Sequence, residues 1–105
     1  MNIKELVKEA TKNATAHGFY DQPIEFGTAI ALIHAELSEA LEEARAERDA
    51  VYVKDGKPEG YGIELADAVI LIASICGSMK IDLEAAIELK MEYNKTRPYK
   101  HGKKF

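Results

Sequence analysis

A chain of 105 residues with a formal net charge of −4 is the size of one domain. Its acidic balance argues against general nucleic-acid binding, which favours a basic face, and its single cysteine excludes an intrachain disulfide or a cysteine-ligated zinc site. The start of the chain lacks the apolar core of a signal peptide. The longest apolar run, residues 65–76, is short for a bilayer and contains Asp67. We expect one cytoplasmic domain over residues 1–105, with no membrane partner.

Helical spacing of apolar residues dominates the chain and predicts an all-α fold. The expected helices cover residues 2–17, 23–48, 62 to about 77, and 83–97. Asn2, with Glu5 three residues later, suits the N-cap of the first helix, and Asp82 suits that of the fourth. Pro23 suits the first position of the second helix, and Pro98 closes the fourth.

The remaining segments carry turn signals. The connection VYVKDGKPEGYG holds three glycines and a proline, and its Asp55-Gly56 pair is typical of a short hairpin turn. The C-terminal segment YKHGKKF is basic, and we expect it to be a loosely held tail.

Three acidic residues line one face of the predicted second helix. Glu36, Glu39 and Glu43 are spaced i, i+3, i+7 and border the apolar stripe, although a solvated acidic face normally lies opposite the core. Like charges this close repel by a few tenths of a kcal/mol per pair. Glu42 and Glu47 show that the helix is acid-rich, so a solvated face with chance spacing is the alternative.

A second acidic pair interrupts the most apolar segment. Glu64 and Asp67 lie in the first turns of a predicted helix that is apolar on most sides and therefore buried. Acids at a helix N-terminus interact well with the helix dipole, which explains Glu64 better than Asp67, one turn deeper. A buried carboxylate must shift its pKa, pair with another group or bind a metal.

The two pairs together indicate a metal site. On antiparallel neighbouring helices, Glu36, Glu39, Glu64 and Asp67 would surround one point, and such a cage of oxygen ligands suits Mg²⁺, with Mn²⁺ as a substitute. A di-iron site is disfavoured, because no histidine follows any of these acids by three residues.

The predicted fourth helix becomes cationic toward its end. Lys90, Asn94 and Arg97 are spaced i, i+4, i+7 on its apolar side. Dipole compensation by ordinary surface lysine is one interpretation, and a phosphate clamp is the other.

Three stretches, HAELSEALEEARAERDA, KPEGYGIELADAVILIA and KMEYNKTRPY, together resemble the MazG-like nucleoside triphosphate pyrophosphohydrolases of the all-α NTP pyrophosphatase superfamily. The family pattern is E-x-x-E, a variable spacer, then E-x-x-D, often followed by Lys, Asn and Arg. The matching residues here are Glu36, Glu39, Glu64 and Asp67, then Lys90, Asn94 and Arg97. The resemblance covers residues 18–99, most of the chain.

The resemblance implies a four-helix bundle completed by homo-oligomerisation, as a homodimer or homotetramer. It also implies Mg²⁺-dependent hydrolysis of a nucleoside triphosphate to the monophosphate and pyrophosphate. We expect Glu39 or Glu43 to activate the water and Lys90, Asn94 and Arg97 to contact the substrate. Phe19, Tyr20 or Tyr52 is a candidate to stack on the base, although each also suits ordinary packing. The alternative function is a non-catalytic helical oligomer that binds a nucleotide or a partner.

Overall fold

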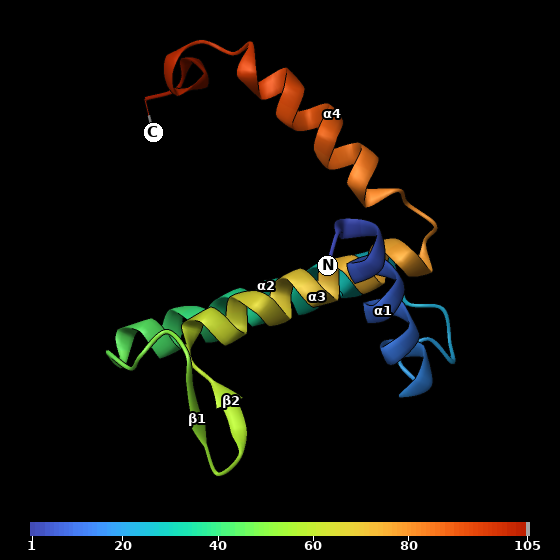
Figure 1. The fold of residues 1–105 in the computed structure, drawn as a ribbon, viewed down its shortest axis with the longest axis vertical. Coiled ribbons are helices and arrows are strands. Elements are labelled where there is room, and N and C mark those ends of the chain that lie inside the picture. The colour runs from blue at the N-terminus through green and yellow to red at the C-terminus, as the bar shows by residue number, and fades with distance from the viewer. Residues whose placement is uncertain (105) are drawn as a thin grey trace.

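The computed structural model describes residues 1–104, and within them it contains four α-helices, one hairpin and a short 3₁₀ turn (Figure 1). The bounds are α1 Ile3–Ala16, α2 Phe26–Arg45, β1 Tyr52–Lys54, β2 Lys57–Glu59, α3 Tyr61–Ser78, α4 Leu83–Lys95 and η1 Tyr99–Gly102. The mostly helical content confirms the predicted all-α class.

The predicted N-caps of α1 and α4 are confirmed. The Asn2 side chain accepts a hydrogen bond from the Glu5 amide at 2.8 Å and donates one to the Glu5 carboxylate at 3.1 Å. Asp82 accepts a hydrogen bond from the Ala85 amide at 3.0 Å. Both caps satisfy amide groups that the first turn of a helix leaves without a partner.

Helix α2 is shorter at both ends than the predicted range of residues 23–48. It begins at Phe26, so Pro23 does not occupy its first position, and Glu25 at the N-cap makes no side-chain capping bond. It ends at Arg45 because Glu47 adopts a left-handed φ of 56°, which a right-handed helix cannot include. Helix α4 also ends early, at Lys95, since Pro98 disfavours helical geometry at the residue before it.

The predicted hairpin turn at Asp55-Gly56 is confirmed. Both residues have positive φ, 52° and 77°, as a two-residue type I′ turn requires, and Tyr52 pairs with Glu59 across the antiparallel ladder. Gly60 then leads directly into α3 with a φ of 114°. A side chain at position 60 would collide with the backbone of Ala50, so only glycine permits this approach.

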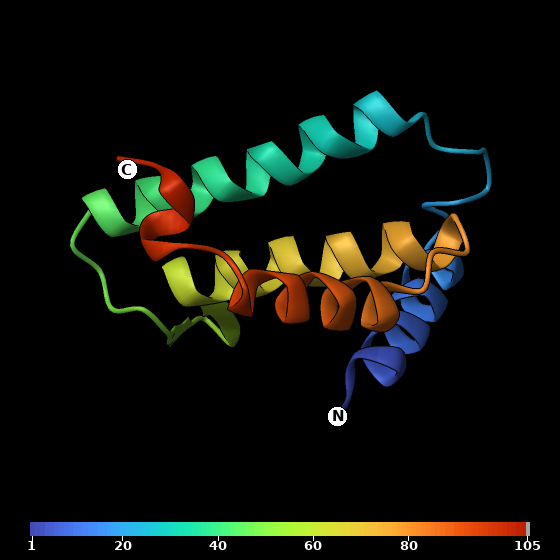
Figure 2. The same cartoon turned by 90° about the horizontal axis from the view of Figure 1, so that it is seen from above.

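Helix α3 is the centre of the packed part of the molecule. It runs antiparallel beside α2, and α1 crosses its C-terminal half (Figure 2). The crossing with α1 is close, because any side chain at Gly77 would meet Thr11. The buried apolar residues are mostly small: Ala10, Ala29, Ala40, Ala68, Ala73 and Ile75. The core of a single chain is therefore thin.

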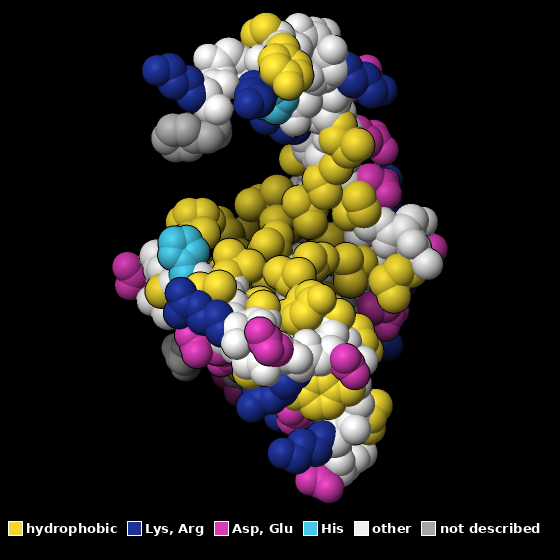
Figure 3. All heavy atoms as spheres, turned by 90° about the vertical axis from the view of Figure 1, so that its left-hand side faces the viewer, with side chains coloured by type: hydrophobic (Ala, Val, Ile, Leu, Met, Phe, Trp, Pro, Cys, Tyr) yellow, Lys and Arg dark blue, Asp and Glu magenta, His cyan; other side chains and the backbone are white. Residues whose placement is uncertain are grey.

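Helix α4 stands apart from the α2–α3 pair. It contains no buried residue, packs mainly against α1, and forms one long ion pair with it, between Lys4 and Glu84 at 3.9 Å. A hollow with hydrophobic walls separates it from the other helices (Figure 3). Large apolar residues that are about half exposed or more include Leu37, Leu41, Leu65, Val69, Leu89 and Met91. One chain alone does not form the predicted four-helix bundle, and its completion by further copies stays a prediction.

Helix α3 extends beyond the apolar run of residues 65–76 at both ends. Over Tyr61–Ser78 its mean hydropathy is 1.5, and by length and composition alone it is the one described helix that could cross a membrane. The core helix of a soluble protein meets the same criteria. Here the helix carries Glu64 and Asp67 and packs against two other helices.

Candidate functional site

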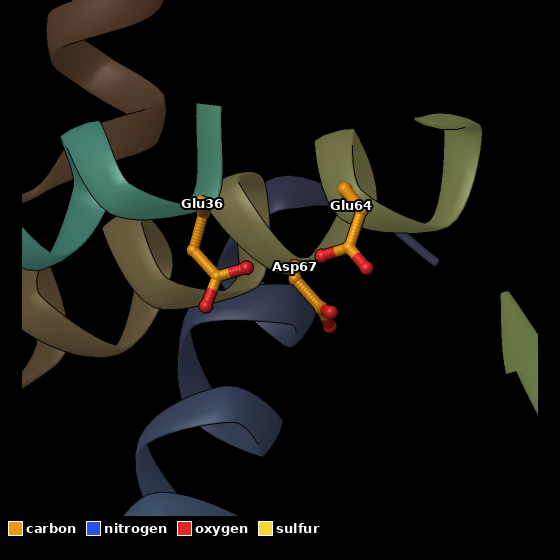
Figure 4. Close-up of side chains that lie close together, drawn as sticks. All are labelled: Glu36, Glu64 and Asp67. Atoms are coloured by element: carbon orange, nitrogen blue, oxygen red, sulfur yellow. The ribbon is translucent and has the colours of Figure 1, made fainter. Parts of the chain in front are cut away.

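Three of the four predicted metal ligands converge. Glu36 projects from α2 toward Glu64 and Asp67 on α3, and one carboxylate oxygen of each lies within 4.8 Å of the others (Figure 4). The antiparallel packing of α2 against α3 produces this convergence, because it places the two E-x-x-E/D segments side by side. We call these three residues the acidic group.

The acidic group is electrostatically strained. Burial raises the pKa of Glu64 to about 7, helped by its interaction with Glu39 and by the charges of Asp67 and Glu36. Burial and the charges of Glu39 and Asp67 also raise the pKa of Glu36. The Glu36 Oε2 atom is buried and has no hydrogen-bond partner among the described residues. Such a set of carboxylates lacks a compensating cation, and a divalent metal with oxygen ligands would supply it.

Glu39 lies beside the acidic group, on the side that faces the hairpin. It is exposed, and together with Glu64 it lines a pocket of about 420 Å³ between α2, α3 and β2. Five carboxylates and two cations, Arg48 and Lys57, line this pocket. Glu39 is therefore near enough to extend the acidic group, as the sequence predicts, although it is not one of the three residues that converge most closely.

Glu43 is held by the hairpin. Its carboxylate accepts hydrogen bonds from the Tyr52 hydroxyl at 3.2 Å and from Arg48 Nη1 at 3.3 Å. The same hydroxyl lies 3.3 Å from Glu59, so its one proton serves two carboxylates. These contacts, together with partial burial as the largest cause, raise the pKa of Tyr52. Tyr52 therefore ties the hairpin to α2, a role different from the base stacking considered for it.

An apolar pocket adjoins the acidic group on its other side. It has a volume of about 440 Å³, and Glu36 and Asp67 form part of its wall. Its remaining lining includes Phe19, Tyr20, Ile24, Leu32, Ile70 and Leu71. The Tyr20 hydroxyl lies 2.8 Å from Ser74 Oγ and can exchange a hydrogen bond with it. A planar apolar group placed in this pocket would have its polar end at the carboxylates.

Sequence reasoning missed the pocket and the role of Ser74. The one available signal was the narrow polar strip of α3, where a serine follows Asp67 by seven residues on a helix that is otherwise apolar. Ser74 is 3% exposed, so its hydroxyl needs partners, and it finds them in Tyr20 and the Leu71 carbonyl.

The predicted cationic residues lie away from the acidic group. Lys90 and Arg97 flank the ring of Tyr93, with Lys90 Nζ at 4.7 Å and Arg97 Cζ at 5.7 Å from its centroid. The Asn94 Oδ1 atom is buried without a partner among the described residues. Lys90 and Asn94 lie in the C-terminal half of α4, and Arg97 follows two residues after its end. Within one chain, therefore, the acidic residues converge but the cationic residues do not join them (Figure 1).

Comparison of the chain with protein-family models, with curated proteins and with solved structures finds no match. The resemblance to the MazG-like pyrophosphohydrolases therefore rests on the sequence motifs alone. The convergence of Glu36, Glu64 and Asp67 is a separate, geometric observation in favour of a metal site.

Proposed function

We propose that this protein is a cytoplasmic, Mg²⁺-dependent nucleoside triphosphate pyrophosphohydrolase, which cleaves between the α and β phosphates to give the monophosphate and pyrophosphate. One observation carries the proposal: the acidic group and the apolar pocket share Glu36 and Asp67 as walls. A nucleotide has the matching chemistry, an apolar planar base joined to phosphates that a metal must neutralise.

The residues present fit a magnesium ion. Glu36, Glu64 and Asp67 would hold it, with Glu39 as a fourth ligand, and the unpartnered Glu36 Oε2 leaves one buried oxygen free for this purpose. Mn²⁺ would substitute, since it also accepts oxygen ligands. When bound, such an ion neutralises phosphate oxygens and lowers the pKa of a bound water.

The chain's own residues position the reactants. Tyr20 and the apolar pocket receive the nucleoside, and the acidic group then lies at its phosphate end. A carboxylate must accept the proton of the attacking water. Glu39 is the better placed of the two candidates, because Tyr52 and Arg48 already engage Glu43. Glu43 then supports the site by anchoring the hairpin.

A second copy of the chain would complete the site. Leu65, Val69 and Leu89 are between 47% and 76% exposed, an arrangement that exposes more apolar surface than a stable monomer usually does. We propose a homodimer or homotetramer in which these faces cover each other. The cationic side of α4 from one copy would then face the acidic group of another, so that Lys90, Asn94 and Arg97 contact phosphate there.

The test is the release of pyrophosphate from a panel of canonical and damaged nucleoside triphosphates, with Mg²⁺ and with a chelator. We expect release that requires Mg²⁺, and we expect Glu36→Gln to abolish it. Glu9→Gln is the control, because Glu9 is exposed on α1 and lines neither of the two pockets beside the acidic group. Binding of nucleotides without release of pyrophosphate would overturn the proposal and favour the non-catalytic oligomer.

A further inference from the structure

The C-terminal residues, expected from the sequence to be a loosely held tail, form a short turn closed by their own backbone hydrogen bonds. The His101 amide donates to the Pro98 carbonyl at 2.7 Å, and the Lys103 amide donates to the Lys100 carbonyl at 2.9 Å. Three successive residues, Lys100, His101 and Gly102, have left-handed φ values of 53°, 54° and 74°. This conformation is costly for lysine and histidine, and costly backbone geometry is concentrated at functional sites.

The turn is also a concentration of positive charge. Residues 95–104 hold five of the chain's 14 Lys and Arg residues and none of its 18 Asp and Glu residues, so the rest of the chain has a net charge of −9. Lys100, His101, Lys103 and Lys104 line an open pocket of about 480 Å³. None of these three lysines forms an ion pair with another described residue. The positive charge of the turn thus has no acidic partner in the described chain.

The position of the turn relates it to the acidic group. After a short connection, helix α4 runs in the direction opposite to α3 while standing apart from it, so the turn lies toward the end of the molecule where α3 begins (Figures 1 and 2). The hydrophobic hollow lies between α4 and the α2–α3 pair (Figure 3), whereas the acidic side chains project toward α1, away from α4 (Figure 4). The turn of one chain would therefore serve the acidic group of a neighbouring copy and not its own.

We propose that the C-terminal turn, residues 99–104, is a binding site for the terminal phosphates of the nucleotide. This inference rests on the proposed function and adds a part of the site that neither the acidic group nor Lys90, Asn94 and Arg97 supplies. Three lysines around one small pocket suit a compact ligand with several negative charges, because each ammonium group offers a point charge and three donors. A long polyanion such as a nucleic acid fits poorly, since the remaining chain would repel it.

The experiment measures the binding of inorganic tripolyphosphate to the full chain by calorimetry, in the presence of a chelator. Without a divalent cation the acidic group repels phosphate, so the signal comes from the cationic residues, and the difference between the wild type and the turn variant reports the turn. We expect Lys100→Gln/Lys103→Gln/Lys104→Gln to weaken binding by about tenfold or more, as charge-assisted contacts are lost. The matched control is Lys8→Gln/Lys54→Gln/Lys80→Gln, which removes the same charge from three separate exposed positions without an ion pair and should leave binding nearly unchanged.

A second variant separates the shape of the turn from its charge. Gly102→Ala retains every lysine and meets nothing closer than Pro98 at 3.9 Å, but its φ of 74° disfavours any side chain. We expect it to weaken binding by about threefold or more, since a displaced backbone spreads the lysines. Unchanged binding in the triple-glutamine variant of the turn, with helical content as in the wild type, would overturn the proposal.

Failure of this inference differs from failure of the proposed function. If pyrophosphate release is normal in the turn variant and its KM for nucleoside triphosphate is unchanged, the turn proposal is wrong and the enzyme proposal stands. If the binding of tripolyphosphate depends on the turn but no nucleotide is hydrolysed, the turn proposal stands and the enzyme proposal is wrong.

Discussion

The α2–α3 pair and α4 differ in what supports their functional side chains. Along α2 and α3, antiparallel packing brings three carboxylates within 4.8 Å of one another. Along α4, the cations line a helix that buries no residue and contacts little beyond α1. The acids are therefore positioned by the fold of one chain, whereas the cations have no fixed partner within it. This difference supports the proposal of a site that is divided between copies, in which separate parts of the fold carry the metal ligands and the phosphate ligands.

The largest expected effect is that of Asp67→Asn. The substitution keeps the shape of the side chain but removes one charge from the acidic group, so Mg²⁺-dependent pyrophosphate release should be abolished. The unfolding free energy of the metal-free protein should change little, because Asp67 is exposed and solvent screens its repulsion of Glu36 and Glu64. Turnover assays and thermal melts of the stripped protein measure both changes. Normal turnover in this variant would show that Asp67 is not a metal ligand and only interacts with the dipole at the N-terminus of α3.

Leu89→Glu tests whether another copy covers α4. Leu89 is 76% exposed within one chain, and burial of such a side chain in an interface contributes roughly 1.5–3 kcal/mol. We expect the variant to be monomeric at micromolar concentration by light scattering and to lose most of its activity. Val53→Glu is the control, since Val53 is 69% exposed on the hairpin, away from α4. A wild-type protein that is already monomeric would contradict the divided site.

Arg97→Ala should act on the phosphates and leave the metal ligands alone. Removal of the guanidinium group should reduce kcat/KM by one to three powers of ten, and each tenfold loss corresponds to about 1.4 kcal/mol of transition-state stabilisation. The Mg²⁺ concentration for half-maximal thermal stabilisation should stay nearly constant, because Arg97 does not contact the acidic group within a chain. A large change in that concentration would show that the two regions are not separate.

The pH dependence follows from Glu64, whose pKa rises from 4.5 to about 7 on folding. Between these values the folded protein holds a proton that the unfolded chain has lost, so the stability of the metal-free protein should fall as pH rises, and level off above about 7. Mg²⁺ requires the ionised carboxylate, so its affinity should fall about tenfold per unit below that pH. Melting temperatures of the stripped protein and Mg²⁺ titrations between about pH 5.5 and 8 test both trends. In the Glu64→Gln variant, the stability of the metal-free protein should fall less with rising pH than it does in the wild type.

The smallest expected effect is that of Tyr52→Phe, at the hairpin end of the α2–α3 pair. It removes a hydroxyl that contacts both Glu43 and Glu59 and should cost about 1 kcal/mol of unfolding free energy. Tyr61→Phe is the matched control, because the Tyr61 hydroxyl makes no hydrogen bond with another described residue. Equal melting temperatures for the two variants would show that the hairpin contact is not stabilising.

The two halves of the acidic group could be predicted from sequence because the spacing within each helix is local, whereas their convergence depends on the packing of α2 against α3. Spacings of three residues place Glu64 with Asp67 on one helix face, and an acid beside an apolar stripe is visible without coordinates. The caps at Asn2 and Asp82 and the Asp55-Gly56 turn were predictable for the same reason.

Features that depend on distant residues could not be predicted. The contact of Tyr52 with Glu43 requires the register of the hairpin and the exact end of α2, which the left-handed Glu47 sets. The apolar pocket combines residues from α1, the following loop, α2 and α3. The apolar stripe on α4 shows which face of this helix must pack against another surface. Whether that surface belongs to the same chain depends on the direction of the short connection after α3.

The lack of buried residues in α4 also affects how the chain folds. A free helix of 13 residues is only marginally populated in water, because its few propagation steps barely offset the free-energy cost of nucleation. Helices α1 to α3 bury one another and can order within a single chain. The helix–coil equilibrium of α4 instead depends on whatever packs against it, so this segment is the last to order and the first to fray. In the proposed oligomer, dilution would unwind the helix that holds Lys90 and Asn94 while the acidic group stays assembled.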